Sequence, residues 1–408
     1  MYKIAYSCKF SQILAQTAKS AIKISVKKTI FVTLIMFRKG VILLLLSAGW
    51  LADGSATLPP AIHHEVPTKA RPLYTADTLT ICVAGDIMMH ITQIEKARRA
   101  NGSFDFRSYF SQIKDDIQNA DISIANMEFT LGGEPYTGYP AFSAPDSYAN
   151  YLADCGFDIF LTANNHILDK GCSGAERTLA KYRELNASHG IQYCGTASDQ
   201  ADRDRTTPLF ITAKGMKIAI INCTYGTNLG ADMHWPKVNY MNNSSLIKDA
   251  LKKAEEADFT IVFPHWGTEY SLTSSEEQQE KARWLIENGA DMIIGTHPHV
   301  VQNIDTIKGV QIIYSLGNAV SNMSAPDTQL GLMAKVRIIR KPSGDIIAPP
   351  VSFKWLWCSR PGGYNNSYTV LPVLSHAEKR NEWKGTWEHD KMMKSYERVR
   401  KATEIEEK

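Results

Sequence analysis

The chain has 408 residues, with 45 Lys and Arg against 42 Asp and Glu, which gives a formal net charge of +3. This length suits one large domain with appended segments. Residues 1–56 contain eight basic side chains and one acidic one, so the remaining residues carry a net charge of −4. The basic excess therefore belongs to the N-terminal segment, and the rest of the chain lacks the basic surface that nucleic-acid binding requires.

The N-terminal segment has the features of a secretory signal. Its basic residues precede an apolar run at 41–52, about 12 residues that are too few to span a bilayer comfortably. Gly54-Ser55-Ala56 then supplies the small side chains of a cleavage site. We expect residues 1–56 to act as a signal peptide or an N-terminal anchor, with Met36 as an alternative start of a compact signal. The protein is accordingly expected to be exported, either to the periplasm or other extracytoplasmic space or to the membrane as an anchored protein.

After this segment the chain is expected to contain a linker, a main domain and a C-terminal extension. The proline-rich residues 57–77 are the expected linker. Residues 78–357 are the main domain, in which short apolar strands alternate with helices, the pattern of an α/β fold with parallel strands. Residues 358–408 are the expected extension, which ends in a charged, solvated helix.

The strands of this main domain are expected at 79–85, 121–125, 158–163, 208–212, 216–223, 259–264, 291–295, 309–314, 332–340 and 350–357, with 208–212 and 216–223 forming a hairpin. The helices are expected at 106–118, 173–189, 244–256 and 275–288, and a long loop at 132–145. Cys82 and Cys223 lie inside buried strands and are expected to be core thiols. Cys155, Cys172, Cys194 and Cys358 can pair in an oxidising compartment, although no spacing decides which of them do.

Five of the expected strands end in residue types that bind metals. These residues are Asp86 and His90 after 79–85, Asn126 and Glu128 after 121–125, Asn164, Asn165 and His166 after 158–163, His265 after 259–264, and His297 and His299 after 291–295. Because α/β sheets place ligands beyond the carboxyl ends of their strands, we expect these side chains to meet at one rim. These candidate ligands are more numerous than one four-coordinate ion uses, so two divalent ions are predicted. The mixture of nitrogen and oxygen donors suits Mn, Fe or Zn.

The strongest of these motifs is His297-Pro298-His299. In an extended segment, side chains at i and i+2 point the same way, so both rings are predicted to face one metal cluster. Glu128 is a candidate bridge between the two ions. Asp86 is a candidate ligand or, alternatively, the N-cap of the next helix. His90 is a candidate ligand or, alternatively, a surface histidine.

The residues that follow the strand expected at 158–163 include a candidate metal ligand and a candidate general acid. The amide oxygen of Asn165 can bind a metal, while His166 is placed to act as a general acid that Asp169, three residues later, can orient. The alternative is an Asn-rich turn that caps the helix expected at 173–189. The candidates for substrate contacts are Asn126, Glu269, Tyr270 and Asn318. The alternatives are turn stabilisation for Asn126, support of the metal ligands for Glu269 and core packing for Tyr270.

Taken together, the motifs resemble a known family. They are Gly85-Asp86-x-x-x-His90, Ala125-Asn126-x-Glu128, Ala163-Asn164-Asn165-His166-x-x-Asp169, His265-Trp266-Gly267-x-Glu269-Tyr270, Gly295-x-His297-Pro298-His299 and Ser315-Leu316-Gly317-Asn318. In this order they resemble the CapA-type capsule synthesis proteins, including the PgsA-like poly-γ-glutamate biosynthesis proteins, over roughly residues 79–323. That family in turn resembles the calcineurin-like metallophosphoesterases.

The resemblance implies a four-layer αββα sandwich, metallo-dependent phosphatase-like, with a two-metal site. It implies a proton donor at His166 and metal ligands at Asp86, Glu128, Asn165, His265, His297 and His299. Three positions depart from the metallophosphoesterase pattern: Met88 stands where His is usual, Glu128 replaces a bridging Asp, and Thr296 replaces a Gly.

The implied role is assembly of a capsule polymer or poly-γ-glutamate in the cell envelope. The implied partners are the envelope polymer or its precursor, and membrane-bound capsule synthesis subunits. Two interpretations of the activity remain. One is a metal-dependent hydrolase or transferase acting on a phosphoester or amide bond of the polymer or its precursor. The other is a non-catalytic envelope subunit that binds the polymer or a membrane partner.

Overall fold

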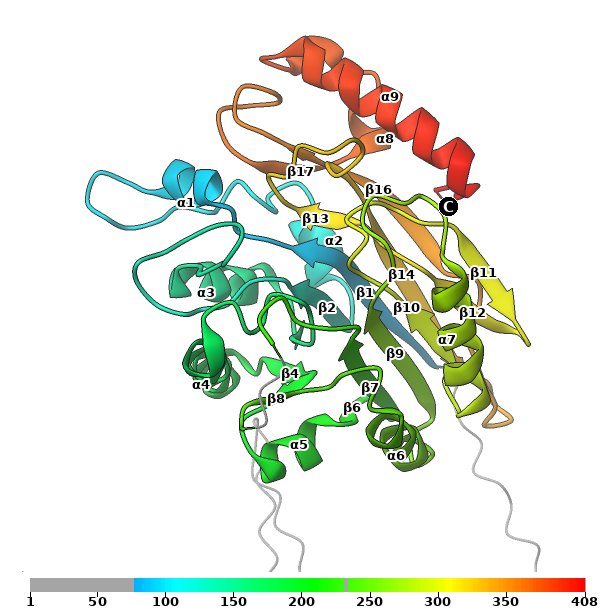
Figure 1. The fold of residues 1–408 in the computed structure, drawn as a ribbon. Coiled ribbons are helices and arrows are strands. Elements are labelled where there is room, and N and C mark those ends of the chain that lie inside the picture. The colour runs from blue at the N-terminus through cyan, green and yellow to red at the C-terminus, as the bar shows by residue number, and fades with distance from the viewer. Residues whose placement is uncertain (1–76, 231–233, 408) are drawn as a thin grey trace, which may run out of the picture. The chain divides into compact units, whose positions relative to one another are not determined.

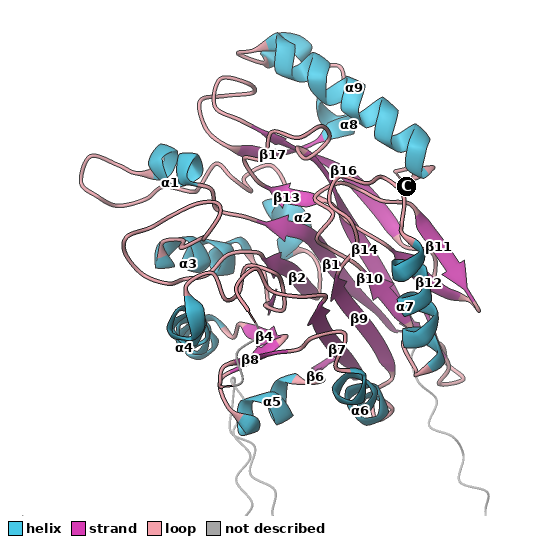
Figure 2. Cartoon of the chain, in the orientation of Figure 1, coloured by secondary structure: helices cyan, strands magenta, loops and turns pink. Residues whose placement is uncertain are grey.

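The computed structural model describes residues 77–230 and 234–407, which belong to one compact unit. The signal and the linker expected for residues 1–76 lie outside the described residues. Among the helices of the described part, none is both long and apolar enough to cross a membrane. The compact unit is built from two large β-sheets and the helices that cover them (Figures 1 and 2).

The first sheet has nine strands and carries the N-terminal half of the site. Its order is β17-β16-β14-β1-β2-β3-β4, with β13 paired to β1 and β15 paired to β14. β1 to β4 run parallel, whereas β14, β16 and β17 add antiparallel strands on one side. Their bounds are β1 (Asp77–Ile87), β2 (Ile122–Met127), β3 (Ile159–Leu161), β4 (Gln192–Cys194), β13 (Asn318–Val320), β14 (Leu330–Arg340), β15 (Ile346–Ile347), β16 (Ser352–Ser359) and β17 (Thr369–Pro372).

The second sheet has six strands in the order β11-β12-β10-β9-β7-β6. Its four inner strands are parallel, and the edge strands β6 and β11 are antiparallel to their neighbours. The bounds are β6 (Leu209–Ala213), β7 (Met216–Thr224), β9 (Phe259–His265), β10 (Met292–Ile294), β11 (Ile304–Ile307) and β12 (Val310–Ile313). A separate small sheet pairs β5 (Thr196–Ala197) with β8 (Lys237–Val238).

Helices cover the outer face of each sheet, and the core between the sheets is apolar. α1 (Ile91–Ala97), α2 (Lys114–Gln118), α3 (Asp146–Cys155) and α4 (Gly171–His189) pack on the nine-stranded sheet. α6 (Ser244–Ala254) and α7 (Glu276–Glu287) pack on the six-stranded sheet. The remaining helices are α5 (Gln200–Thr206), α8 (Val373–His376), η1 (Arg380–Glu382) and α9 (Thr386–Thr403). Between the sheets, side chains such as Ile81 and Val83 meet Ile218 and Ile261, so the expected αββα sandwich is confirmed.

The helix expected at 106–118 is wrong for most of its length. Only Lys114–Gln118 is helical, because the preceding residues form successive turns. The N–H groups of Tyr109 and Ile113 donate to the carbonyl oxygens three residues earlier. Such turns bury aromatic side chains at nearly helical spacing, so periodicity alone does not distinguish them from an α-helix.

The C-terminal boundary expected at residue 357 does not separate two parts of the structure. β17 pairs with β16 and so extends the nine-stranded sheet. α9 was expected to be solvated, but it buries Met392 and Val399 in the core between the sheets. The expectation of a solvated helix is therefore wrong for one face of α9. The charged residues of the other face dominate the composition of the helix, and composition alone therefore predicts a solvated one.

The buried cysteines behave as core residues. Cys82 and Cys223 are almost fully buried, as expected, and burial raises the pKa of each thiol to about 12. Cys155, Cys194 and Cys358 are buried free thiols as well. These five sulfur atoms contribute apolar packing rather than cross-links.

Candidate metal centre

Polar side chains at the carboxyl ends of strands in both sheets meet in one buried cluster. Asp86 lies at the end of β1, Glu128 follows β2, His265 ends β9, and His297 and His299 follow β10. Their potential ligand atoms form two groups, each lying within 4.8 Å: Asp86 with Glu128 and His265, and Glu128 with His297 and His299. All five side chains are buried, and Glu128 belongs to both groups.

A cation is a better partner for the Glu128 carboxylate than any of the described protein groups around it. It is fully buried, and neither of its oxygen atoms has a hydrogen-bond donor among the described residues. The nearest imidazole nitrogens are Nε2 of His265, at 3.6 Å, and Nε2 of His299, at 3.7 Å. Burial, with the nearby carboxylate of Asp86, raises the pKa of Glu128. An unpaired buried carboxylate is costly, so this donor set fits a divalent cation held against it.

The backbone of His297-Pro298-His299 is not extended, contrary to the sequence prediction. His297 has a φ of 99° and His299 a φ of 59°, a region that side-chain-bearing residues seldom adopt. The N–H of His297 donates to Oδ2 of Asp86 at 3.1 Å, which ties this bend to β1. The two rings nevertheless converge, with centroids 5.8 Å apart. A tight bend, rather than strand alternation, therefore brings both imidazoles to the cluster.

Neighbouring polar groups orient two of the imidazoles. Nδ1 of His299 lies 3.0 Å from Oδ1 of Asn318, and Nδ1 of His265 lies 2.9 Å from Oγ1 of Thr296. Each contact occupies Nδ1 and leaves Nε2 directed towards Glu128. Burial lowers the pKa of His265 and of His297, which favours the neutral imidazole that metals bind.

Two asparagines complete the inner part of the cluster. Asn126 donates its Nδ2–H to Oδ1 of Asp86 at 2.7 Å, and Oδ1 of Asn165 lies 2.9 Å from Nε2 of His265. Asn165 thus faces the same point as His265, as two ligands of one ion do. Asp86 is not a helix N-cap, because it lies within β1 and the N-cap of α1 is His90.

His90 was predicted to be a ligand, but it does not belong to either group of ligand atoms. Its Nδ1 contacts Oε1 of Gln93 at 3.1 Å and the N–H of Asn322 at 3.2 Å. It is partly buried and engaged by these contacts, so it is not an ordinary surface histidine either, and burial lowers its pKa to about 4. The His90 and His166 rings both pack edge-on against Phe142, with centroid separations of 5.2 and 4.6 Å.

His166 and Asp169 form a buried pair beside the cluster. Nδ1 of His166 lies 2.7 Å from Oδ2 of Asp169, and this carboxylate also accepts the N–H of Phe142 at 2.7 Å. The acceptor fixes the proton on Nδ1, which leaves Nε2 to exchange a proton. His166 lies outside both groups of ligand atoms. This geometry suits the general-acid role that the sequence suggests, and the role itself stays a prediction.

The four residues expected to contact substrate divide into two pairs. Asn126 and Asn318 are buried, and their amides contact protein groups, so the geometry gives them a positioning role rather than the expected substrate contact. Glu269 and Tyr270 are exposed beside the cluster. The N–H of Tyr270 donates to the carbonyl oxygen of Pro298 at 2.8 Å, and its ring lies 6.4 Å from that of His299.

Tyr225 and Asn228, which follow β7, are not among the site residues predicted from the sequence. Tyr225 is 47% exposed, and the centroid of its ring lies 4.6 Å from that of His297. Nδ2 of Asn228 lies 3.3 Å from Nδ1 of His166, and its backbone N–H donates to the carbonyl oxygen of Asn165. The segment Thr224-Tyr225-Gly226-Thr227-Asn228 is a further run of polar residues after a buried strand, which is the sequence signal for this part of the site.

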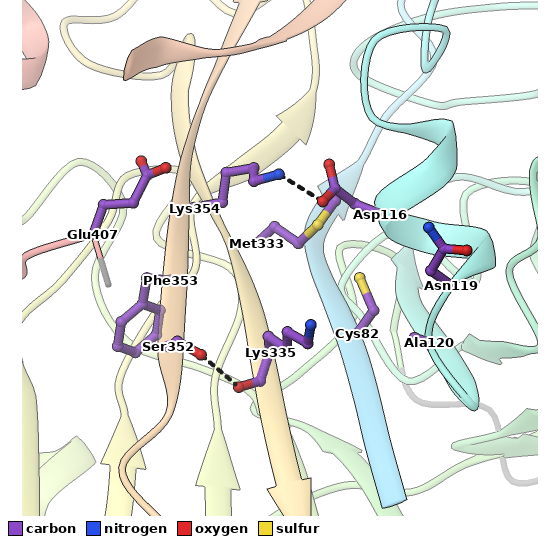
Figure 3. Close-up of a pocket in the computed structure, with 10 residues that line it drawn as sticks. All are labelled: Cys82, Asp116, Asn119, Ala120, Met333, Lys335, Ser352, Phe353, Lys354 and Glu407. Atoms are coloured by element: carbon purple, nitrogen blue, oxygen red, sulfur yellow. Dashed lines mark hydrogen bonds and ion pairs between the residues drawn. The ribbon is translucent and has the colours of Figure 1, made fainter. Parts of the chain in front are cut away.

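A pocket on the outer face of the nine-stranded sheet is separate from this cluster (Figure 3). Cys82 and Met333 contribute apolar side chains to it, and an ion pair joins Lys354 Nζ to Asp116 Oδ1 at 2.5 Å. Cys82 precedes Asp86 by four residues on β1, a rise of about 13 Å, and its side chain faces the outer helices. The pocket therefore contributes no side chain to the candidate metal centre.

The two stacked sheets with their outer helices, and the buried carboxylate shared by two groups of ligand atoms, together define an αββα sandwich with a candidate metal site at one rim. The family model described as bacterial capsule synthesis protein PGA_cap matches residues 80–323, and the chain belongs to this family. The CapA-type resemblance drawn from the motifs is thereby confirmed.

Two relatives and one solved structure illustrate the range of similarity. The capsule biosynthesis protein CapA of Bacillus anthracis is 28% identical over 291 residues, which cover 68% of this chain and 65% of that protein, just under two thirds of its length. The PGA biosynthesis protein CapA of Bacillus subtilis (strain 168) is 26% identical over 289 residues, covering 68% of this chain and 72% of that protein. The structure of Haemophilus influenzae NAD nucleotidase (NadN) aligns with a TM-score of 0.40 and 12% identity, over 79% of this chain and 63% of that one.

Proposed function

We propose that this capsule-family protein is a two-metal hydrolase of the cell envelope that cleaves a phosphoester or amide bond of an exopolymer of the poly-γ-glutamate type or of its precursor. The observation that carries the proposal is Glu128, a buried carboxylate that has no hydrogen-bond donor among the residues described by the structure and that belongs to two groups of ligand atoms. One carboxylate commonly bridges the ions of a two-metal site. Membership of the capsule synthesis family supports the polymer context.

The ligand sets follow from the two groups. Asp86, Glu128 and His265, with the amide oxygen of Asn165, would hold one ion. Glu128, His297 and His299 would hold the other. Mn, Fe or Zn suits this combination of oxygen and imidazole donors. Divalent ions at these positions supply polarisation of the scissile group and stabilisation of the charge that develops on it.

The protein's own residues supply the proton and the walls of the site. Asp169 holds Nδ1 of His166, so Nε2 is the nitrogen that can deliver a proton to the leaving group. Burial of His166 and Asp169 excludes bulk water from this transfer. Tyr225 and Tyr270, both partly exposed beside the histidines, are the residues best placed to contact the substrate.

We propose further that the protein acts outside the cytoplasm, because residues 1–56 have the pattern of a signal or anchor. Its partners would then be the envelope polymer or precursor and membrane-bound subunits of capsule synthesis. The alternative, a subunit that binds the polymer without cleaving it, makes a different prediction for the experiment that follows.

The test combines elemental analysis with a hydrolysis screen on the full chain, purified without chelator. We expect two divalent ions per chain and hydrolysis of either bis(4-nitrophenyl) phosphate or a short γ-glutamyl peptide. Glu128→Gln should lose metal and activity, whereas Glu287→Gln, at an exposed position at the end of α7, should keep both. Bound metal without hydrolysis of any polymer or precursor would favour the binding subunit. Absence of metal, even after reconstitution, would refute the two-metal centre.

A further inference from the structure

β7 carries a buried amide on the face that it turns towards the other sheet. Met216, Ile218 and Ile220 point from this strand into the core between the two sheets. Asn222 lies two residues further along and therefore shares their face, and it is only 1% exposed. An amide in such a core costs free energy unless hydrogen bonds satisfy it. Its place on β7 therefore depends on the groups that it contacts.

The amide of Asn222 joins two segments that belong to different sheets. Its Oδ1 accepts the backbone N–H of Thr162 at 3.0 Å and that of Ala163 at 2.7 Å. Thr162 and Ala163 come directly after β3 of the nine-stranded sheet. Its Nδ2–H donates to the carbonyl oxygen of Phe263 at 2.9 Å, two residues before His265 on β9 of the six-stranded sheet. One side chain thus links the end of β3 to the end of β9.

These two segments present side chains that meet in the candidate metal centre. Asn165 follows Ala163 by two residues, and its Oδ1 lies 2.9 Å from Nε2 of His265. The residues after β7 hold the same segments a second time. The N–H of Tyr225 donates to the carbonyl oxygen of His265 at 2.9 Å, and that of Asn228 donates to the carbonyl oxygen of Asn165 at 2.8 Å. β7 and the residues that follow it therefore link the two segments at two levels.

The backbone around Asn222 fixes the position of its amide. Gly195, directly after β4, has a φ of 108°, and a Cβ there would lie 2.1 Å from Oδ1 of Asn222 and 2.5 Å from the backbone nitrogen of Ala163. Only glycine permits this close approach. Asn239 closes the arrangement, because its Nδ2–H donates to the carbonyl oxygen of Asn222 at 3.2 Å and its backbone N–H to that of Gly195 at 2.8 Å. The amide is therefore held on several sides by neighbouring backbone.

We infer that Asn222 is a positioning residue of the metal centre, which aligns Asn165 with His265 and so shapes the place of the ion that both would hold. β3 and β9 lie in different sheets, so no ladder of β-sheet hydrogen bonds aligns the two segments. Metal ligands need to be held within about 0.5 Å of their working geometry, which the amide of Asn222 achieves from behind. The inference rests on the two-metal centre of the proposed function and not on hydrolysis.

The group of ligand atoms around the other ion is oriented by different contacts. The N–H of His297 donates to Oδ2 of Asp86 on β1, and Nδ1 of His299 contacts Oδ1 of Asn318 on β13. Neither contact involves β7. Loss of the Asn222 amide should therefore weaken one ion more than the other, whereas a general loosening of the fold would weaken both.

Equilibrium dialysis of the full chain against graded Mn²⁺, with elemental analysis of the retained metal, tests this inference. The wild type should bind two ions. Asn222→Ala should weaken one of them by about tenfold or more, as loss of a contact behind a ligand does, and leave the other nearly unchanged. Thr178→Val is the control, because it removes a buried hydroxyl of α4 that bonds to Leu131 and Gly174. It should bind both ions like the wild type.

Double variants identify which ion Asn222 affects. His265→Ala should lose the ion that Asn222 positions, so adding Asn222→Ala to it should weaken the remaining ion no further. Adding Asn222→Ala to His299→Ala should instead weaken the ion that the single variant retains. Equal weakening of both ions by Asn222→Ala, or unchanged affinity for both, would overturn the inference and leave the proposed function standing. A wild type that binds no metal would refute the metal centre itself, and the inference with it.

Asn222→Asp provides a second, milder change. Its carboxylate oxygens can still accept the N–H groups of Thr162 and Ala163, but the bond to the carbonyl oxygen of Phe263 is lost. It should therefore weaken the same ion by a smaller factor than Asn222→Ala does. Circular dichroism reports whether each variant folds. If Asn222→Ala does not fold, Asn222→Asp decides, and a folded Asn222→Asp with the wild-type affinity for both ions would overturn the inference.

Discussion

His299 donates its Nδ1–H to Oδ1 of Asn318 at 3.0 Å, and this bond directs Nε2 of His299 towards Glu128, 3.7 Å away. Asn318 is itself held, because its Nδ2–H donates to the carbonyl oxygen of Thr328 at 2.9 Å. β13 begins at Asn318 and pairs there with Asp86 of β1. One asparagine thus fixes both the tautomer of a candidate ligand and its direction.

Asn318→Ala is predicted to weaken metal binding about 10- to 100-fold, the usual effect of removing the group that orients a metal-binding histidine. His299 would keep its side chain but lose its preferred tautomer. Calorimetric titration with Zn²⁺ or Mn²⁺ measures the change, and Asn288→Ala, at the end of α7, serves as the control. Unchanged affinity would show that the bend at His299 alone orients the ring.

His166→Ala is predicted to keep the metal content and to lower the rate of hydrolysis about 10²- to 10⁴-fold, because it removes a general acid. His297→Ala should lose both metal and activity, since His297 is in a group of ligand atoms and His166 is not. Elemental analysis and initial rates on the two variants separate the roles. If His166→Ala loses as much metal as His297→Ala, the roles assigned here are wrong. If neither change affects polymer production in cells, the site is not catalytic there.

Removal of metal is predicted to destabilise the wild type. The unpaired carboxylate of Glu128 then remains buried, whereas bound ions stabilise the folded state by about 4 kcal/mol at concentrations of a thousand times Kd. Thermal unfolding followed by circular dichroism should show a lower Tm on addition of EDTA. Glu128→Gln should show little response to EDTA, because it no longer binds the ions tightly. A wild-type Tm that does not change with EDTA would contradict the prediction.

A stability effect that depends on pH is expected at Asp121, away from the metal centre. Its Oδ2 accepts the N–H of Thr80 at 2.8 Å and lies 2.9 Å from Nζ of Lys214. Although burial alone would raise the pKa of Asp121, these contacts hold it below the ordinary value of 3.8. The stabilisation is therefore present above pH 3.8 and is lost as the pH falls through the lower pKa of the folded state.

Asp121→Asn should accordingly lower the free energy of unfolding by about 1 kcal/mol at neutral pH and by progressively less below pH 4. Urea unfolding at several pH values measures the difference. Asp115→Asn, at an exposed position in α2, is the control. An Asp121→Asn effect that is constant over this range of pH would show that the carboxylate charge is not its cause.

Export of the protein is predicted from its N-terminal 56 residues. Cell fractionation should find the chain in the membrane or extracytoplasmic fraction, and sequencing of its N-terminus separates a cleaved signal from a retained anchor. Full-length chain in the soluble cytoplasmic fraction would contradict the prediction.

Much of the site could be predicted from the sequence because the carboxyl end of a buried strand is visible in the local sequence pattern. An apolar run followed by Asp86, His265 or His297 identifies a strand and the residue at its carboxyl end without knowledge of its partners. The roles of Asn318 and Tyr225 could not be predicted in this way. They depend on the pairing of β13 with β1 and on the place of β7 beside β9, both of which join segments distant in the sequence.

The sequence by itself thus determined which residues lie at the rim of the two sheets, since hydrophobic periodicity sets strand bounds within a few residues. Only the tertiary structure decided which atoms face one another there. It replaced the extended His297-Pro298-His299 by a bend with two positive φ angles and kept His90 out of the ligand groups. It also left the Glu128 carboxylate, which both ligand groups share, without a hydrogen-bond donor in the described part of the chain. The physical reason is that the contacts around these atoms come from both sheets. The position of one sheet relative to the other is fixed by side-chain packing in their common core and not by any local sequence pattern.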